Sequence, residues 1–121
     1  MSGHIYLIQE REFINNRLPI YKVGRTQDII KRFQHYPKNS KLIFSFYVNN
    51  CKDAENDVKE KLSHKFQNKE EIGKEYFQGN VTDIIESIFN VCKHSCFHLQ
   101  NIIDESVKNE CLKNIENKEL A

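Results

Sequence analysis

The sequence predicts an α+β fold: a small three-stranded antiparallel sheet flanked by helices, with a C-terminal helical extension. The chain has 121 residues, enough for one domain with a modest core but too few for two ordinary ones. Strand-like and helix-like segments follow in the order ββαβα, and helical patterns follow these. The first two strand-like segments are joined by polar residues without helical periodicity, which favours an antiparallel pair over a parallel crossover.

Three segments have the composition of strands. His4–Ile8 is short and rich in β-branched and aromatic residues, and such residues favour a pleated sheet. Residues 9–19 contain Asn-Asn and Pro, which are typical of a loop. Ile20–Gly24 is the second strand and is expected to end at its glycine. Lys41–Val48 gives the clearest strand pattern, and its aromatic residues are expected to be mostly buried.

Three segments have helical patterns. The first is expected to be capped by Thr26 or Asp28 and to end before Pro37, because the residue preceding proline avoids the α region. Its apolar stripe consists of Ile29, Ile30 and Phe33. The second is expected to begin at Asp53. Its stripe at helical spacing consists of Ala54, Val58, Leu62 and Phe66.

A polar segment with two glycines, residues 67–80, is expected to form a loop with one brief extended piece, Glu75–Phe77. Thr82 is then expected to cap a long helix. Its buried side is predicted to contain Ile84, Ile85, Ile88, Phe89, Val91, Cys92, Cys96 and Leu99. Cys92 and Cys96 point away from His94 and His98 on such a helix, so burial as small hydrophobic groups is favoured over a zinc site.

Composition and charge limit the function classes. Hydrophobic residues make up 39% and charged residues 29% of the chain, a profile typical of a globular protein. The formal net charge is only +1, so binding to an anion requires a local basic patch. No segment has the roughly 20 apolar residues that span a bilayer, and no membrane partner is expected. The N-terminus lacks signal-peptide features, and the four cysteines show no disulfide framework. We expect an intracellular protein, in the cytoplasm or nucleus, with a virus-infected host cell as one setting.

The segment IYKVGRTQDIIKRFQHY, residues 20–36, concentrates basic residues where a strand turns into a helix. Gly24 permits a tight turn, and the helix start offers backbone N–H groups to a phosphate. Tyr36 follows Arg32 at i+4 and shares its helix face. Lys22 and Arg32 can therefore converge on one anion. The alternative is an ordinary solvated basic face.

The motifs HIY and KVG, with Arg32 eight residues after Gly24, resemble the GIY-YIG nuclease superfamily. The longer strings YKVGRT, KRFQHY, DAEN and GKEYFQGN are similar to a branch of it found in phages and large DNA viruses. The resemblance runs from about residue 3 to residue 89. It implies a GIY-YIG-like nuclease domain over residues 1–90, with residues 91–121 as a C-terminal helical extension of the same domain.

The resemblance implies metal-dependent hydrolysis of DNA phosphodiester bonds. Tyr6 is expected to help activate the attacking water, and Arg32 to stabilise the scissile phosphate. Glu55 is expected to hold one Mg²⁺ or Mn²⁺, with Glu75 as the second candidate. Such roles suit the chemistry, because negative charge builds on the phosphoryl oxygens and a hard cation needs only one or two carboxylates. No small-molecule cofactor is expected.

Further residues around this site are expected to contact DNA: Gly24, Arg25, Lys31 and Tyr36. Lys22 stands where most members of the superfamily have a second tyrosine, and it can hold a phosphate or act as a base. Tyr21 lies one residue too early and should point to the other sheet face.

Several interpretations remain open at this point. Glu55 is equally the kind of acidic residue that the helix dipole favours near an N-terminus. Because Lys22 replaces a tyrosine, the chain is either an active endonuclease or a catalytically weakened DNA-binding module. A protein-interaction domain is the third hypothesis, suggested by the charged helical tail. The small net charge suggests that an oligomer or a partner domain helps to target DNA.

Overall fold

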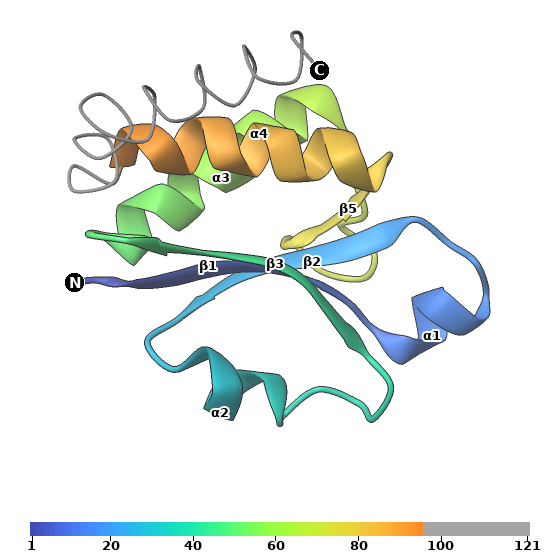
Figure 1. Ribbon diagram of the computed structural model, residues 1–121. Coiled ribbons are helices and arrows are strands. Elements are labelled where there is room, and N and C mark those ends of the chain that lie inside the picture. Colours follow the sequence, from blue (N-terminus) through green and yellow to red (C-terminus); the bar gives the residue numbers. More distant parts are fainter. Residues whose placement is uncertain (96–121) are drawn as a thin grey trace, which may run out of the picture.

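The structure is a computed structural model that describes residues 1–95, and it shows an α+β fold (Figure 1). The strands are β1 (Gly3–Gln9), β2 (Ile20–Thr26), β3 (Lys41–Val48), β4 (Gln67–Asn68) and β5 (Tyr76–Gln78). The helices are α1 (Arg11–Asn15), α2 (Ile29–Phe33), α3 (Cys51–Lys65) and α4 (Val81–Ser95). No helix within these residues is long and apolar enough to cross a membrane.

The sheet of the described residues has five strands in the order β3-β1-β2-β5-β4, and the neighbours pair antiparallel. The antiparallel pairing of the first two strands is therefore confirmed, whereas the predicted three-stranded sheet is wrong. The additional strands come from the segment that was expected to be mainly a loop. They contain two and three residues, too few for an alternating pattern to stand out in the sequence.

The link between β1 and β2 contains the one-turn helix α1 instead of loop alone. This helix buries none of its residues, so the sequence contains no apolar stripe that would predict it. α2 is also one turn long, and the side chain of Asp28 caps it by accepting a hydrogen bond from the backbone N–H of Lys31 at 3.0 Å. The predicted burial of Ile30 is wrong, because that residue is 73% exposed.

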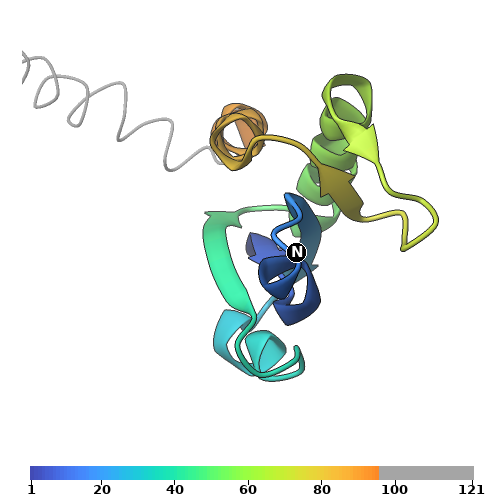
Figure 2. The same ribbon diagram turned by 90° about the vertical axis from the view of Figure 1, so that its right-hand side faces the viewer.

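Helices α3 and α4 cover one face of the sheet, while α2 lies on the other (Figures 1 and 2). The predicted stripe of α3 is confirmed, with Ala54, Val58 and Leu62 fully buried. On α4, Ile84, Ile88 and Cys92 are likewise buried. These side chains pack against alternate residues of the strands, Ile5 and Leu7 of β1 and Val23 of β2.

The predicted caps of the two long helices are wrong by two or three residues. The side-chain oxygen of Asn50 accepts a hydrogen bond from the backbone N–H of Asp53 at 3.2 Å. Asn80 in the same way accepts from Asp83 at 3.2 Å. Asparagine is as good an N-cap as aspartate or serine, so the sequence offered several caps of equal quality within one turn.

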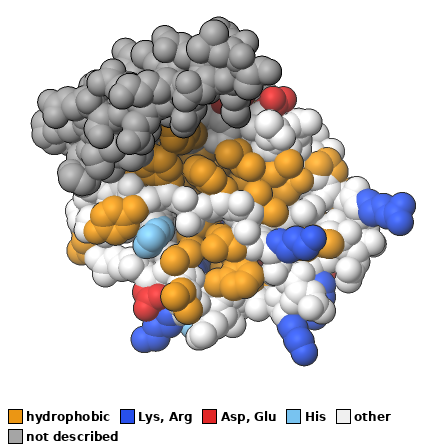
Figure 3. All heavy atoms as spheres, viewed as in Figure 1, with side chains coloured by type: hydrophobic (Ala, Val, Ile, Leu, Met, Phe, Trp, Pro, Cys, Tyr) orange, Lys and Arg blue, Asp and Glu red, His pale blue; other side chains and the backbone are white. Residues whose placement is uncertain are grey.

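Strand β3 forms an edge of the sheet, and several hydrophobic side chains reach the surface near it (Figure 3). Phe44 and Phe46 are partly buried against the core, but Tyr47 is 53% exposed, contrary to the expectation for this strand. Phe46 packs edge-on against Phe89 of α4, with ring centroids 5.6 Å apart. The proposed boundary at residue 90 falls within α4, and the division into domain and extension stays a prediction. Cys96, His98 and Leu99 lie outside the described residues.

Candidate active site on the α2 face

Tyr6 lies in the middle of β1 directly opposite Gly24 of β2. Its neighbours Ile5 and Leu7 face the core, so the Tyr6 side chain points to the α2 face, because strand side chains alternate. A Cβ atom placed on Gly24 would overlap the Tyr6 hydroxyl oxygen and the adjacent ring carbons. The prediction that Gly24 ends the strand in a turn is therefore wrong. β2 continues to Thr26, and the glycine leaves room for the end of the Tyr6 ring.

The Tyr6 hydroxyl is the centre of a hydrogen-bonded group. Its oxygen lies 2.7 Å from the hydroxyl oxygen of Tyr36, and the Nε–H of Arg32 donates to it at 3.3 Å. The rings of Tyr6 and Tyr36 also meet edge to face, with centroids 6.2 Å apart. Residues separated by about thirty positions in the sequence are thus brought together at one point.

Burial, together with the hydrogen bond to Tyr36, raises the pKa of Tyr6 to about 12. Arg32 opposes both effects, because a nearby cation favours the phenolate. The contact with Tyr6 in turn raises the pKa of Arg32. At neutral pH the site therefore contains a neutral phenol next to a fixed positive charge.

Lys22 supplies a second cation on the same face, two residues before Gly24 on β2. Its Nζ lies 5.0 Å from the centre of the Tyr36 ring and 5.7 Å from that of Tyr76. Both distances are in the range of cation–π contacts. Glu75 approaches the same nitrogen at 3.9 Å. The ammonium group is thus held between two aromatic rings and one carboxylate.

Tyr76 and Glu10 are members of this group that the sequence did not reveal. The Tyr76 hydroxyl donates a hydrogen bond to the Glu10 carboxylate, and burial together with this carboxylate raises the pKa of Tyr76. Glu10 lies between β1 and α1, in a segment without a motif. Tyr76 belongs to the extended piece expected at Glu75–Phe77, which gave no sign of the partner of its hydroxyl.

Glu55 has different surroundings. It lies on α3, on the opposite side of the sheet from α2, and its carboxylate is 3.4 Å from Arg25 Nε and 3.5 Å from Lys59 Nζ. Arg25 pairs with the core residue Ile5 across the strands, so it points to the α3 face. The structure thus joins Glu55 to Arg25, and brings Glu75 rather than Glu55 next to Lys22. Arg25 lies in the segment Gly24–Thr26, which is the end of β2 that does not pair with β5.

The helix start expected to bind a phosphate is already occupied. The Asp28 carboxylate accepts from the first turn of α2, and a second anion there would meet its negative charge. Lys31 is exposed on α2, near this corner. Tyr21 lies in the core, which confirms that it faces away from Tyr6 and cannot replace the second tyrosine.

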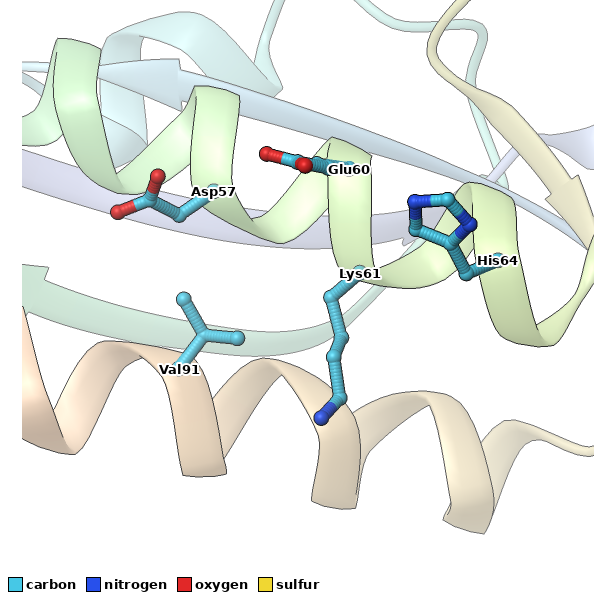
Figure 4. A pocket seen from close by; sticks show the side chains of 5 residues that line it. All are labelled: Asp57, Glu60, Lys61, His64 and Val91. Atoms are coloured by element: carbon cyan, nitrogen blue, oxygen red, sulfur yellow. The ribbon is translucent and has the colours of Figure 1, made fainter.

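A hollow lies between α3 and α4, on the side of the sheet opposite α2, and is lined by Asp57, Glu60, Lys61, His64 and Val91 (Figure 4). The Lys61 side chain extends towards α4, while the two carboxylates and the imidazole are spread along α3 (Figure 4). Within residues 1–95, no group of three or more His, Cys, Asp or Glu side chains is placed to hold a metal ion. This hollow therefore offers no ready-made metal centre.

Comparison with known proteins gives one match. A family model of the T5orf172 domain matches residues 3–92, which include every residue of the group around Tyr6. Neither a curated protein nor a solved structure matches the chain.

Proposed function

The chain belongs to the T5orf172 domain family, a nuclease-related family found in phages, and on this premise we propose that it is a metal-dependent endonuclease that hydrolyses DNA phosphodiester bonds. The proposal takes the site to be of the GIY-YIG type. The single observation that supports it most is the position of the Tyr6 hydroxyl, between the Tyr36 hydroxyl at 2.7 Å and the Arg32 guanidinium at 3.3 Å.

In this proposal the phosphate binds beside Arg32 and Lys22. Hydrolysis places extra negative charge on the phosphoryl oxygens, and a guanidinium and an ammonium that are already held in place stabilise that charge without reorganisation. Arg32 is held by Tyr6, and Lys22 is held by the rings of Tyr36 and Tyr76. The cations are therefore preorganised before substrate arrives.

Tyr6 is the group proposed to orient the attacking water. A phenol that keeps its proton at neutral pH can accept a hydrogen bond from water and so hold it in place, but it does not itself take a proton from it. Tyr36 orients the Tyr6 hydroxyl for this role, since the two hydroxyls are hydrogen-bonded directly. We propose that Tyr36, supplied by the segment after α2, does the work of the tyrosine that Lys22 replaces in β2.

A single Mg²⁺ or Mn²⁺ fits this chemistry, because such ions accept one carboxylate and complete their shell with water and phosphate oxygens. When bound, the ion would stabilise charge on the phosphate and lower the pKa of a bound water. Glu75 is supported as its ligand by its position beside the Tyr6 group, although Lys22 Nζ, 3.9 Å from its carboxylate, would have to move aside. Glu55 is supported by the resemblance, but its carboxylate is engaged by Arg25 and Lys59, which would have to be displaced.

A DNA-binding module with weak turnover is the second candidate. The observation that favours it is the pairing of Glu55 with two cations, which leaves one fewer carboxylate free for a metal. In that case Arg32, Lys22 and Lys31 bind the DNA backbone, and cutting is slow. Phosphate contacts of this kind give affinity without sequence specificity.

Nicking of supercoiled plasmid with Mg²⁺, with Mn²⁺ and with EDTA tests the proposal. We expect metal-dependent nicking that falls by about 10²–10³-fold in Arg32→Ala, the usual loss when a transition-state charge loses its partner. Lys52→Ala is the matched control, since this exposed cation lies on α3, across the sheet. Wild-type nicking no faster than that of Arg32→Ala would exclude the enzyme, and a gel shift would then test the binding module.

Metal titration of two glutamine variants separates the candidate ligands. If Glu75 holds the ion, Glu75→Gln requires a much higher Mg²⁺ concentration for half-maximal nicking, while Glu55→Gln behaves as the wild type. The reverse result assigns the ion to Glu55. Glutamine keeps the size of each side chain and removes only its charge, so a change in the metal requirement reports on the ligand.

A further inference from the structure

A pocket of about 550 Å³ opens beside Tyr36, on the same side of the sheet as the Tyr6 group. It is formed by seven residues of the segment 33–40, which runs from the end of α2 to the residue before β3. Tyr36 belongs to both places: it lines the pocket, and its hydroxyl bonds to Tyr6. Anything bound in the pocket therefore lies next to the site of the proposed reaction.

The lining of the pocket combines apolar rings with amides and one cation. Phe33, Tyr36 and Pro37 provide flat apolar surfaces, whereas Gln34 and Asn39 provide hydrogen-bond donors and acceptors. Asn39 has a left-handed backbone conformation with φ 72°, which asparagine tolerates better than most residues. Lys38 adds a positive charge.

This chemistry is that of a site for a nucleobase. Bases without a paired partner are held by stacking on aromatic side chains and by hydrogen bonds to their edges, and a nearby cation suits the phosphate that follows. The volume is also within the range of small-ligand pockets, roughly 300–1,000 Å³. A base that is paired inside a duplex cannot present its face or its edge to such a pocket.

We propose that this pocket binds an unpaired base of the nucleotide next to the scissile phosphate, so that the substrate class is DNA with unpaired nucleotides rather than fully paired duplex. The inference rests on the proposed function for its scissile phosphate. It goes beyond it by assigning a separate binding site and a preference among DNA structures. The Tyr36 ring, shared by both sites, fixes the base and the phosphate within one nucleotide of each other.

Equilibrium binding in EDTA tests the pocket without requiring catalysis. Three labelled DNAs of one sequence are compared by fluorescence anisotropy: a full duplex, the same duplex with one bulged nucleotide, and the same bulge without its base. We expect the bulged nucleotide to bind about tenfold more tightly than the abasic bulge, as stacking of one base on an aromatic side chain predicts. Equal affinity for these two DNAs would overturn the proposal.

Variants of the pocket locate the effect. Phe33→Leu keeps an apolar side chain but removes the stacking surface, and Gln34→Ala removes an amide. Each is expected to reduce the preference for the base severalfold. His35→Ala is the matched control, because His35 is exposed between pocket residues but does not line the pocket. If the preference survives both pocket variants, the base binds elsewhere and the proposal fails.

Nicking of the same DNAs keeps this inference distinct from the proposed function. If bulged DNA is preferred in EDTA but no metal supports cutting of any DNA, the endonuclease proposal fails and the pocket remains. If all three DNAs are cut and bound equally well, the endonuclease stands and the pocket proposal is overturned.

Discussion

The two faces of the sheet differ in what they do for the molecule, although the same two strands supply both. From β1 and β2, Ile5, Leu7 and Val23 enter the core under α3 and α4. The neighbours of these residues along the strands, Tyr6 on β1 and Lys22 on β2, face α2 and contact polar and aromatic partners. One face of the sheet is covered by the two long helices α3 and α4, whereas the other is covered by the single short turn of α2.

Stability and chemistry are thus separated by the alternation of strand side chains. The helical face is dominated by apolar burial, the main favourable contribution to folding. The α2 face keeps Arg32 exposed and the Lys22 ammonium between rings, an arrangement that contributes little to a core but is available to a phosphate. Substitutions on the two faces should therefore fall into two classes.

The largest expected effect is on the helical face. Leu62→Ala removes a fully buried side chain of α3 and leaves a cavity, which typically lowers the free energy of unfolding by about 2–5 kcal/mol. Urea unfolding followed by circular dichroism measures it. Leu18→Ala is the matched control, because Leu18 is 40% exposed, and its midpoint should stay close to that of the wild type. Equal losses in the two variants would contradict the assignment of Leu62 to the core under α3 and α4.

A smaller effect is expected at the contact between β2 and Tyr6. Gly24→Ala places a methyl group against the Tyr6 ring, and such overpacking typically costs about 1–3 kcal/mol. It also displaces the hydroxyl from Arg32, so nicking should fall with it. In a Tyr6→Ala background the methyl group meets no ring, and the added alanine should cost nothing or stabilise slightly. An unchanged cost in that background would show that the strain lies elsewhere.

The smallest effect is a pH dependence of stability. The pKa of Tyr6 is raised from 10.0 to about 12, so the unfolded chain loses this proton first. The stability it contributes is present below pH 10 and is lost as the pH rises from 10 towards 12. Between pH 8 and pH 11 the wild type should lose about 1 kcal/mol more than Tyr6→Phe. Urea unfolding at the two pH values measures this, and identical losses in both proteins would refute it.

Much of the fold could be predicted because its signals are local. The composition of β3 and the apolar stripe of α3 each occupy one continuous segment, and the structure confirms both. The extended piece predicted at Glu75–Phe77 overlaps β5, but its place in the sheet could not be predicted, and neither could β4. A strand of two or three residues has no periodicity, and these two form because β2 offers an edge to β5, which in turn pairs with β4. The same holds for α1, which buries no residue.

The candidate site was predictable in part. Tyr6, Lys22 and Arg32 were identified by their motifs, and the structure brings Tyr6 and Arg32 into a hydrogen bond. The wrong expectation for Gly24 arose because glycine in a sequence suggests a turn, whereas here it makes room for a ring on another strand. The contact of Tyr76 with Glu10 joins residues 66 positions apart, and no local pattern encodes such a pair.

The sequence by itself determined the fold class, the antiparallel pairing of the first two strands and the alternation that sends Tyr6 and Tyr21 to opposite faces. These properties follow from composition and from the two-residue repeat of a strand, which are local. Three contacts could be seen only in the folded chain: Tyr36 completes the pair of hydroxyls, Glu75 lies beside Lys22, and Glu55 pairs with Arg25. Each of these contacts joins two segments that are separated by a loop, and the relative position of such segments is fixed by packing of the whole domain.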